Sequence, residues 1–334
     1  MKASRIAVCG LIFAMTVVLS RRIMAQVSSS CPEAVSSPRD LAMELTVNGG
    51  QSVFQQGEII PLRVRCSSGS KSKYLFNNRN YDRSGRLDGP DSICIQPNPG
   101  TDPLDDYFHS YGGFMGGGLF SEQQVTAKPI STALELNEWV TLPPGEYRLR
   151  VLSKRISLGS EGNYKTWDHA SVPVQSDWIS FRITKPEPAW QLSTLRDATT
   201  TLDSASSTPD QEEHAARVLR FLNSEDAARD LARRFWKSEG NLRWNFEAGL
   251  YGTPFRRTAI QEMKTVLRES RDGTRDWFID VLVNLEMQSD PRFRQLRYGT
   301  QLADREKNPG SSYDREHRRR AIAYASGAAS GMLK

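Results

Sequence analysis

The sequence predicts an α+β protein with two parts, an antiparallel β-sandwich at residues 40–186 and an all-α helical array at 187–334. In the first part, apolar and polar side chains alternate in short runs separated by Gly, Pro, Asn and Asp, which is the pattern of antiparallel strands. In the second part, apolar side chains recur three and four residues apart, as in amphipathic helices. Two prolines in TKPEPAW (184–190) separate the parts, because proline continues neither a central strand nor a helix interior.

The N-terminus has the pattern of an export signal. Basic residues precede the apolar run Ile6–Leu19 and Ala25 fits a cleavage site, so residues 1–25 are predicted to be a signal peptide and 26–39 a flexible segment. The run is shorter than the roughly 20 residues that a membrane-spanning helix needs. Two arginines that follow it are unusual in a signal, and they leave an uncleaved anchor as the alternative. We expect a secreted or periplasmic protein with no transmembrane span in the mature chain.

The cysteines indicate a disulfide rather than a metal site. Cys9 would leave with the signal peptide, so that Cys31, Cys66 and Cys94 remain in the exported chain. Export favours disulfide formation, and Cys66 and Cys94 both lie in strand-like runs. These two cysteines are therefore a candidate disulfide pair, and unpaired thiols are the alternative. Their spacing does not match that of metal ligands such as C-x-x-C.

The β part contains runs that each have one apolar face. In GEIIPLRVRC that face consists of Ile60, Leu62, Val64 and Cys66. The motif L-x-P-G-x-Y-x-L-x-V at 142–151 resembles the corner between two strands in immunoglobulin-like and fibronectin type III-like domains. The resemblance implies an Ig-like sandwich in which the ring of Tyr147 packs inside and its hydroxyl bonds back to the turn, which is a structural role.

The helical part begins with a capping motif. Thr208 is expected to cap a helix, with Pro209 at its first position and Gln211 reaching back to the cap. Further amphipathic runs follow, and the apolar positions of Ala215 and Ala259 are separated by a period of roughly 44 residues, close to that of HEAT and armadillo repeats. We predict a short HEAT-like array, with a plain helical bundle as the alternative.

The whole arrangement resembles a group of exported bacterial proteins of unknown function that have an Ig-like sandwich followed by HEAT-like helices. The resemblance is carried by the runs GEIIPLRVRC, DRSGRLDGPD, GTDPLDDYF, GGGL, LNEWVTLPPGEYRLRV and DWISFRIT. It implies no catalytic residues. HEAT repeats in general offer concave protein-binding surfaces, and the resemblance therefore implies a protein partner.

The glycine-rich stretch FHSYGGFMGGGLF (108–120) is a candidate ligand-binding loop. It lacks the lysine of a phosphate-binding P-loop, and the flanking runs predict strands on both sides, so we expect no nucleotide. Its aromatic surroundings suit a sugar or a peptide instead, and the alternative is a loop that packs its own aromatics against the sandwich. The candidate ligand-binding residues are Tyr107, His109, Tyr111, Phe114 and Trp167.

Three acidic residues beside this loop, Asp102, Asp105 and Asp106, are candidate calcium ligands, because calcium prefers oxygen ligands in such loops. Asp is also an ordinary turn residue, which is the alternative. No other cofactor is expected. The chain has neither H-E-x-x-H nor G-x-S-x-G, so no zinc protease or hydrolase motif is present.

The formal net charge of +5 is modest and unevenly distributed. Ten Lys and Arg but only four Asp and Glu lie between Pro291 and Lys334. Because nucleic-acid-binding proteins usually carry a basic face on their folded body, we expect no nucleic-acid partner. Arg315 and Arg318–Arg320 are predicted to lie on a basic helix that suits an anionic lipid surface or an acidic partner, and the alternative is a solvated face.

Together these observations predict an exported, non-enzymatic protein-interaction protein, a scaffold or adaptor that binds another protein through its helical array. The first alternative is a carbohydrate- or calcium-binding sandwich that uses the loops at 102–120. The second alternative is a hydrolase of unidentified type.

Overall fold

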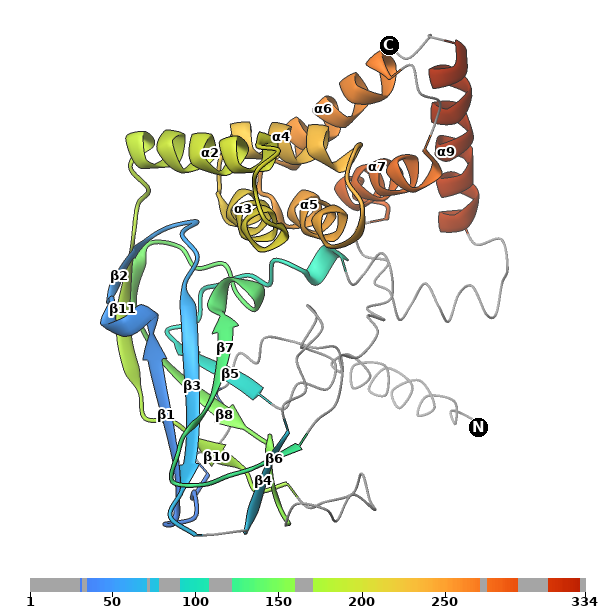
Figure 1. Cartoon of the computed structure of the whole chain (residues 1–334). Coiled ribbons are helices and arrows are strands. Elements are labelled where there is room, and N and C mark those ends of the chain that lie inside the picture. The colour runs from blue at the N-terminus through green and yellow to red at the C-terminus, as the bar shows by residue number, and fades with distance from the viewer. Residues whose placement is uncertain are drawn as a thin grey trace, which may run out of the picture.

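The protein is described by a computed structural model that covers Cys31 and residues 35–70, 73–77, 91–107, 122–159, 171–270, 275–293 and 312–330. The chain has α+β structure, with largely antiparallel sheets in the N-terminal half and helices in the C-terminal half (Figure 1). This content confirms the α+β prediction. The last strand ends at Thr184 and the first described helix of the C-terminal half begins at Pro188, within the proline-containing segment.

The strands form three sheets. The strands are β1 (Leu41–Val47), β2 (Val53–Gln55), β3 (Pro61–Ser68), β4 (Tyr74–Asn77), β5 (Asp91–Gln96), β6 (Glu122–Gln124), β7 (Ile130–Glu135), β8 (Gly145–Ser153), β9 (Ile156–Leu158), β10 (Val174–Gln175) and β11 (Ile179–Thr184). One sheet has the order β1-β3-β7, a second has the order β10-β8-β11-β2 with β5 also paired to β8, and a third has the order β6-β4-β9. All described pairs are antiparallel except β11 with β2.

The first two sheets share one apolar core. Side chains of β1, β3 and β7 are buried in the same cluster as those of β2, β8 and β11. The predicted apolar face of β3 is confirmed, since Ile60, Leu62, Val64 and Cys66 are all buried. Tyr147 also behaves as predicted: its ring is buried and its hydroxyl donates a hydrogen bond to the carbonyl oxygen of Pro143 at 2.7 Å.

The predicted disulfide between Cys66 and Cys94 is wrong. Cys94 is bonded to Cys31, 63 residues earlier, whereas Cys66 is a free, fully buried thiol. The physical reason is strand alternation. Ile93 and Ile95 face the core, so Cys94 points to the other face of β5, away from the inward-facing Cys66. Burial raises the pKa of the Cys66 thiol to about 12 and keeps it protonated.

The disulfide holds an N-terminal segment that the sequence predicts to be flexible. Among the described residues of 26–39, Cys31 is bonded to Cys94, and the backbone amide of Val35 donates to the side chain of Gln175 at 3.2 Å. The hydroxyl of Ser37 in turn accepts a hydrogen bond from the backbone amide of Gln175 at 3.2 Å. These described residues are therefore attached to the second sheet at β5 and β10.

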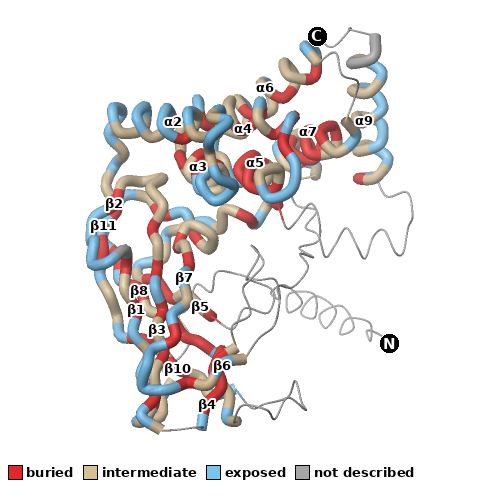
Figure 2. Tube along the Cα trace, in the orientation of Figure 1, coloured by how far each residue is buried: buried red, intermediate tan, exposed pale blue. Residues whose placement is uncertain are grey.

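The described helices of the C-terminal half are arranged in two rows. They are α2 (Pro188–Asp203), α3 (Pro209–Phe221), α4 (Glu225–Phe235), α5 (Gly240–Gly252), α6 (Arg256–Glu269), α7 (Asp276–Ser289) and α9 (Ser312–Ser330). α3 packs on α5 and α4 packs on α6, so alternate helices are neighbours within a row, and their buried faces meet between the rows (Figures 1 and 2). None of the helices in the described ranges combines the length and apolarity needed to cross a membrane.

The sequence motifs locate several of these helices but not all of them. The capping motif is confirmed, because the side chain of Thr208 accepts from the Gln211 amide and Gln211 bonds back to the Thr208 amide. No amphipathic run predicts α5 as a separate helix, because glycines and aromatic residues obscure the pattern there. In an array of two-helix units, equivalent helices are two apart along the chain. Ala215 lies in α3 and Ala259 in α6, which are three apart, so the spacing of these two residues is not the length of one repeat.

A pair of arginines on α3 attaches the helices to the β region. The guanidinium of Arg220 donates to both carboxylate oxygens of Glu138 at 2.9 and 2.7 Å, with 1% of the Arg220 side chain exposed. Its flat faces lie near the rings of Trp244 and Phe221, at 4.5 and 4.7 Å from the ring centroids. One turn earlier, Arg217 pairs with Glu135 at 3.2 Å. Burial raises the pKa of Glu135 despite this arginine.

Backbone segments also approach closely at this interface. Gly57 adopts φ +94° next to the end of α3, and a Cβ there would lie 3.0 Å from the carbonyl oxygen of Phe221. A Cβ on Gly252 would lie 2.7 Å from the carbonyl oxygen of Pro103. The two glycines therefore allow the β region and the helices to touch through their backbones.

We expect loss of the disulfide to destabilise the protein. Its loop spans 63 residues, for which chain entropy predicts a contribution of about 4 kcal/mol. Cys94→Ser should lower the thermal midpoint, and a reductant should lower that of the wild type to the same value. Cys66→Ala is the control and should keep its sensitivity to reductant. Equal midpoints with and without reductant would contradict the pairing.

We expect Arg220→Met to cost about 3 kcal/mol in the free energy of unfolding measured with urea, because it leaves Glu138 partly buried without its cation. The matched control is Arg182→Met, whose partner Glu146 has 76% of its side chain exposed. Since exposed ion pairs contribute less than about 1 kcal/mol, this control should change stability little. If Arg220→Met lowers the free energy of unfolding as little as Arg182→Met does, the Arg220 pair is no more than a surface contact.

Candidate functional site

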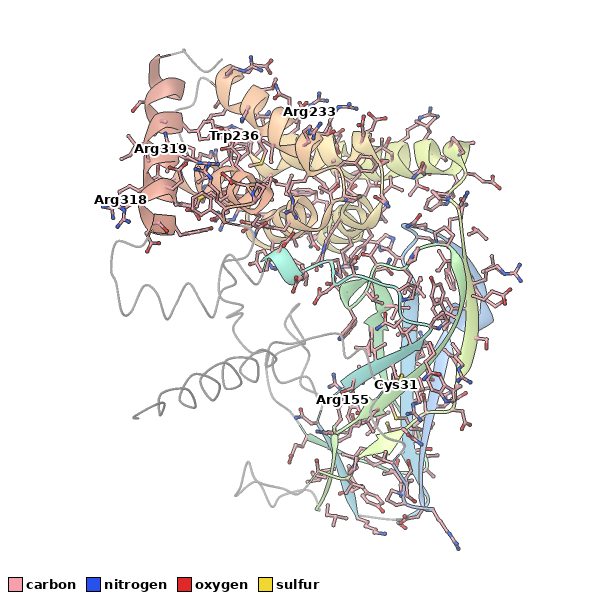
Figure 3. The ribbon with its side chains drawn as sticks, turned by 180° about the vertical axis from the view of Figure 1, so that it is seen from behind. Cys31, Arg155, Arg233, Trp236, Arg318 and Arg319 are labelled. Atoms are coloured by element: carbon pink, nitrogen blue, oxygen red, sulfur yellow. A yellow bond between two sulfur atoms is a disulfide. The ribbon has the colours of Figure 1, made fainter. Side chains whose placement is uncertain are left out.

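An open depression with a volume of about 790 Å³ lies on the helices. It is bounded by the end of α2, the second half of α4, the start of α5 and the end of α6, and we call it the α4 groove. Figure 3 labels Arg233 and Trp236, which line it. The apolar lining residues are Leu202, Trp236, Leu242, Phe246 and Val266. The charged lining residues are Asp203, Asp230, Arg233, Arg234, Lys237 and Glu269.

The groove has an aromatic floor. Trp236 and Phe246 are 4% and 3% exposed, and Trp236 packs edge-to-face on Phe278 with ring centroids 4.9 Å apart. The strong amphipathic pattern of α4 explains this position, since its apolar face is buried and the chain continues directly into Trp236. The floor is consequently rigid, because it belongs to the core of the helical region.

Ion pairs order one wall of the groove. Arg234 bonds to Asp230 at 2.6 Å and to Asp203 at 2.9 Å, and so joins α4 to the end of α2. The hydrogen bond from Arg234 holds the pKa of Asp203 below its usual value. Arg233 pairs with Glu262 of α6 at 2.6 Å. These carboxylates already accept hydrogen bonds from arginines, which makes them poor candidates for general acids or bases.

Other charges at the groove have no ionic partner among the described residues. Lys237 and Glu269 are both exposed, and no ion pair within the described ranges includes either of them. Next to the groove, the guanidinium of Arg275 lies over the ring of Trp236 at 5.5 Å and over that of Trp277 at 5.8 Å. The guanidinium of Arg243 also lies over the ring of Trp277, 5.2 Å from its centroid.

This arrangement is suited to binding. Arg is among the residues most enriched at the energetic centres of protein interfaces. Lys237 and Glu269, which have no ionic partner within the described ranges, offer partners to charges on a ligand. Ser238, the buried hydroxyl beside Trp236, donates to the carbonyl oxygen of Phe235 at 2.9 Å. The described lining therefore contains no paired nucleophile and base of the kind that acyl transfer needs.

The residues predicted to bind a ligand are not assembled by the described structure. Tyr107 is 7% exposed and packs against Trp244 and Tyr251 in the core of the helical region. Its prediction as a ligand-binding residue is wrong, because a ring that fills this core cannot stack on a ligand. His109, Tyr111, Phe114 and Trp167 lie outside the described residues, as does the glycine-rich stretch 108–120.

The aspartates predicted to bind calcium have other partners. The carboxylate of Asp102 accepts a hydrogen bond from the backbone amide of Leu104 at 2.8 Å, which is a turn contact. Asp106 pairs with Arg256 of α6 at 2.5 Å. Asp105 is not brought together with them as a ligand set, since the described residues contain no group of three or more His, Cys, Asp or Glu that could hold a metal. The pair between Asp106 and Arg256 attaches the segment to the helices.

A second depression lies between the β region and the helices, beside Arg220 and Gly57, and has a volume of about 50 Å³. This space is far smaller than the α4 groove and suits a few water molecules better than a larger ligand. The α4 groove is therefore the better candidate for a functional site.

The sequence did not identify the α4 groove. The one available signal was Trp236 followed by Lys237 immediately after the amphipathic run of α4. No protein-family model matches the chain, and no curated protein matches it significantly.

We expect the floor and the rim of the groove to respond differently to substitution. Trp236→Ala should cost about 3 kcal/mol in the free energy of unfolding, because it leaves a cavity in the helical core. Lys237→Ala should change that free energy by less than about 0.5 kcal/mol, because the side chain is exposed. Urea unfolding measures both, and a destabilised Lys237→Ala would mean that this lysine serves the fold.

Proposed function

We propose that this protein is an exported, non-enzymatic adaptor that binds another protein through the α4 groove. The observation that carries the proposal is the groove itself, an open depression of about 790 Å³ with an aromatic floor and charged walls. Small-molecule sites are usually more enclosed and bury most of the ligand. An extended or helical segment of a protein fits an open groove better.

The packing of the helices supports a HEAT-like array. α3 packs on α5 and α4 packs on α6, which is the neighbour relation expected when helix pairs stack along one direction. Such arrays bind partners along one continuous row of helices, and the groove lies along α2, α4 and α6, which form one row in Figure 1. We assign the groove to protein binding for this reason.

The β region supports the remaining parts of the proposal. The two sheets with a common core and the Tyr147–Pro143 hydrogen bond fit an Ig-like sandwich. The disulfide between Cys31 and Cys94 fits an oxidising compartment outside the cytosol. In this proposal, the β region is a support that holds the helical array rather than the binding surface.

Charge reversal at the rim of the groove tests the proposal. Lys237→Glu should weaken partner binding by about tenfold or more, because an unpaired rim charge is reversed without disturbing the core. The measurement is affinity capture from periplasmic or secreted extract with the folded full chain as bait, followed by titration of the captured protein. Arg275→Ala removes the guanidinium that lies over Trp236 and Trp277, and so tests this neighbouring surface separately.

The matched control is Lys128→Glu, which makes the same charge change at an exposed lysine of the β region. It should capture the same partner as the wild type with the same affinity. The proposal fails if both groove variants bind the captured protein as tightly as the wild type does. It also fails if Lys128→Glu weakens binding as strongly as Lys237→Glu.

A further inference from the structure

A second surface lies on α9, away from the α4 groove. α9 stands along one side of the helical region and packs on α7 (Figure 1). On its inner side, Tyr313 donates a hydrogen bond to Asn284 at 3.0 Å and Tyr324 donates to Glu286 at 2.6 Å. The position of α9 on α7 is therefore fixed by polar contacts as well as by apolar packing.

The arginines of α9 are divided between the two sides of the helix. Arg320 lies inside, with 17% of its side chain exposed, and bonds to Glu316 at 2.7 Å and to Asp290 at 3.2 Å. Its neighbours Arg318 and Arg319 are exposed, and Figure 3 shows Arg318 projecting away from the molecule. Arg320 is thus a structural residue and does not belong to the outer basic face that the sequence suggested.

Arg292, three residues after the end of α7, joins this outer face. It pairs with Asp290 at 2.6 Å, and the same Asp290 oxygen accepts from Arg320. The chain of contacts continues from Arg320 through Glu316 to Arg319, which pairs with Glu316 at 2.7 Å. One network of hydrogen bonds therefore holds Arg292 and Arg319 in place.

In this network, the two cations Arg292 and Arg319 are outermost, whereas Arg320 and the anions are recessed. The side chains of Arg292 and Arg319 are 70% and 68% exposed, whereas those of Asp290 and Glu316 are 16% and 17% exposed. The hydrogen bond from Arg319 lowers the pKa of Glu316 to about 2, so this carboxylate stays ionised. The groups most exposed to solvent are therefore guanidinium groups, and the outer face is positive although the recessed carboxylates are charged.

An exposed apolar residue accompanies these arginines. Ile322 is 59% exposed and lies one turn after Arg318 and Arg319, so all three occupy the outer side of α9. A convex helix face with arginines around one exposed isoleucine suits a flat anionic surface, where cations meet headgroups and the apolar side chain enters the interface. An acidic peptide would pair with the arginines but would leave Ile322 in water, whereas a membrane interface would bury it as well.

We propose that Arg292, Arg315, Arg318, Arg319 and Ile322 form a face that docks on anionic phospholipid. This α9 face would hold the protein at a membrane surface through electrostatic contact. Because the α4 groove is lined by other residues, the two surfaces can act at the same time. The proposal does not depend on the function assigned to the groove.

Binding to vesicles tests this proposal. The probes are vesicles of phosphatidylcholine alone and vesicles with equal parts of phosphatidylcholine and phosphatidylglycerol, incubated with the full chain and separated by sedimentation. The N-terminal run Ile6–Leu19 and the basic residues that flank it would also bind vesicles, so the decisive readout is the part of the anionic preference that is lost when the α9 arginines are removed. We expect preferential binding to the anionic vesicles that weakens as salt is added.

The variants locate the contact. Each surface arginine contributes about fivefold to binding at an anionic membrane, so Arg292→Gln, Arg318→Gln and Arg319→Gln combined should reduce binding about a hundredfold. The matched control combines Arg63→Gln, Arg65→Gln and Arg182→Gln, which remove the same charge from the β region and should leave most of the preference. Arg318→Gln alone disturbs no described ion pair and should reduce binding about fivefold, which guards against unfolding of the triple variant.

Three results would overturn the proposal. The first is equal binding of the wild type to neutral and anionic vesicles. The second is an undiminished preference in the triple α9 variant. The third is binding of polyglutamate, but not of the anionic vesicles, that is lost in the triple variant, since this result would assign the face to an acidic protein instead.

Discussion

The orientation of the helices on the β region depends on the buried guanidinium of Arg220. It donates two hydrogen bonds to Glu138 of the β region and lies over the rings of Trp244 and Phe221 on the helical side. A planar, permanently charged group satisfies both requirements at once, and lysine would not. Once this cation is buried, Glu138 must stay opposite it, because an unpaired charge there would be costly.

The interface extends beyond this ion pair. The short segment that contains Pro103 and Tyr107 comes from the β half of the sequence, yet Tyr107 fills the core of the helical region and Asp106 pairs with Arg256. Gly252 allows the backbone at Pro103 to approach α5. The two halves are therefore joined by ion pairs, a shared aromatic cluster and backbone contact, and the β region can position the helical array as a fixed support.

The two proposed surfaces have different physical designs. In the α4 groove, buried aromatics form a rigid floor and most charges are paired, so the surface can contribute shape and a few specific contacts. On the α9 face, recessed carboxylates hold exposed arginines, so the surface contributes positive potential with little shape. Shape favours a particular protein segment, whereas a diffuse positive potential suits a membrane that presents many equivalent anions.

The sequence by itself determined the class of each half and several local contacts. Alternation placed Leu62 and Val64 in a buried strand face, the turn motif placed Tyr147, and the capping motif placed Thr208, because each depends on residues close together in the chain. Only the tertiary structure decided the disulfide partner of Cys94, the burial of Tyr107, the inward position of Arg320 and the existence of the groove. Each of these depends on which distant segments meet, and neither periodicity nor spacing records that information.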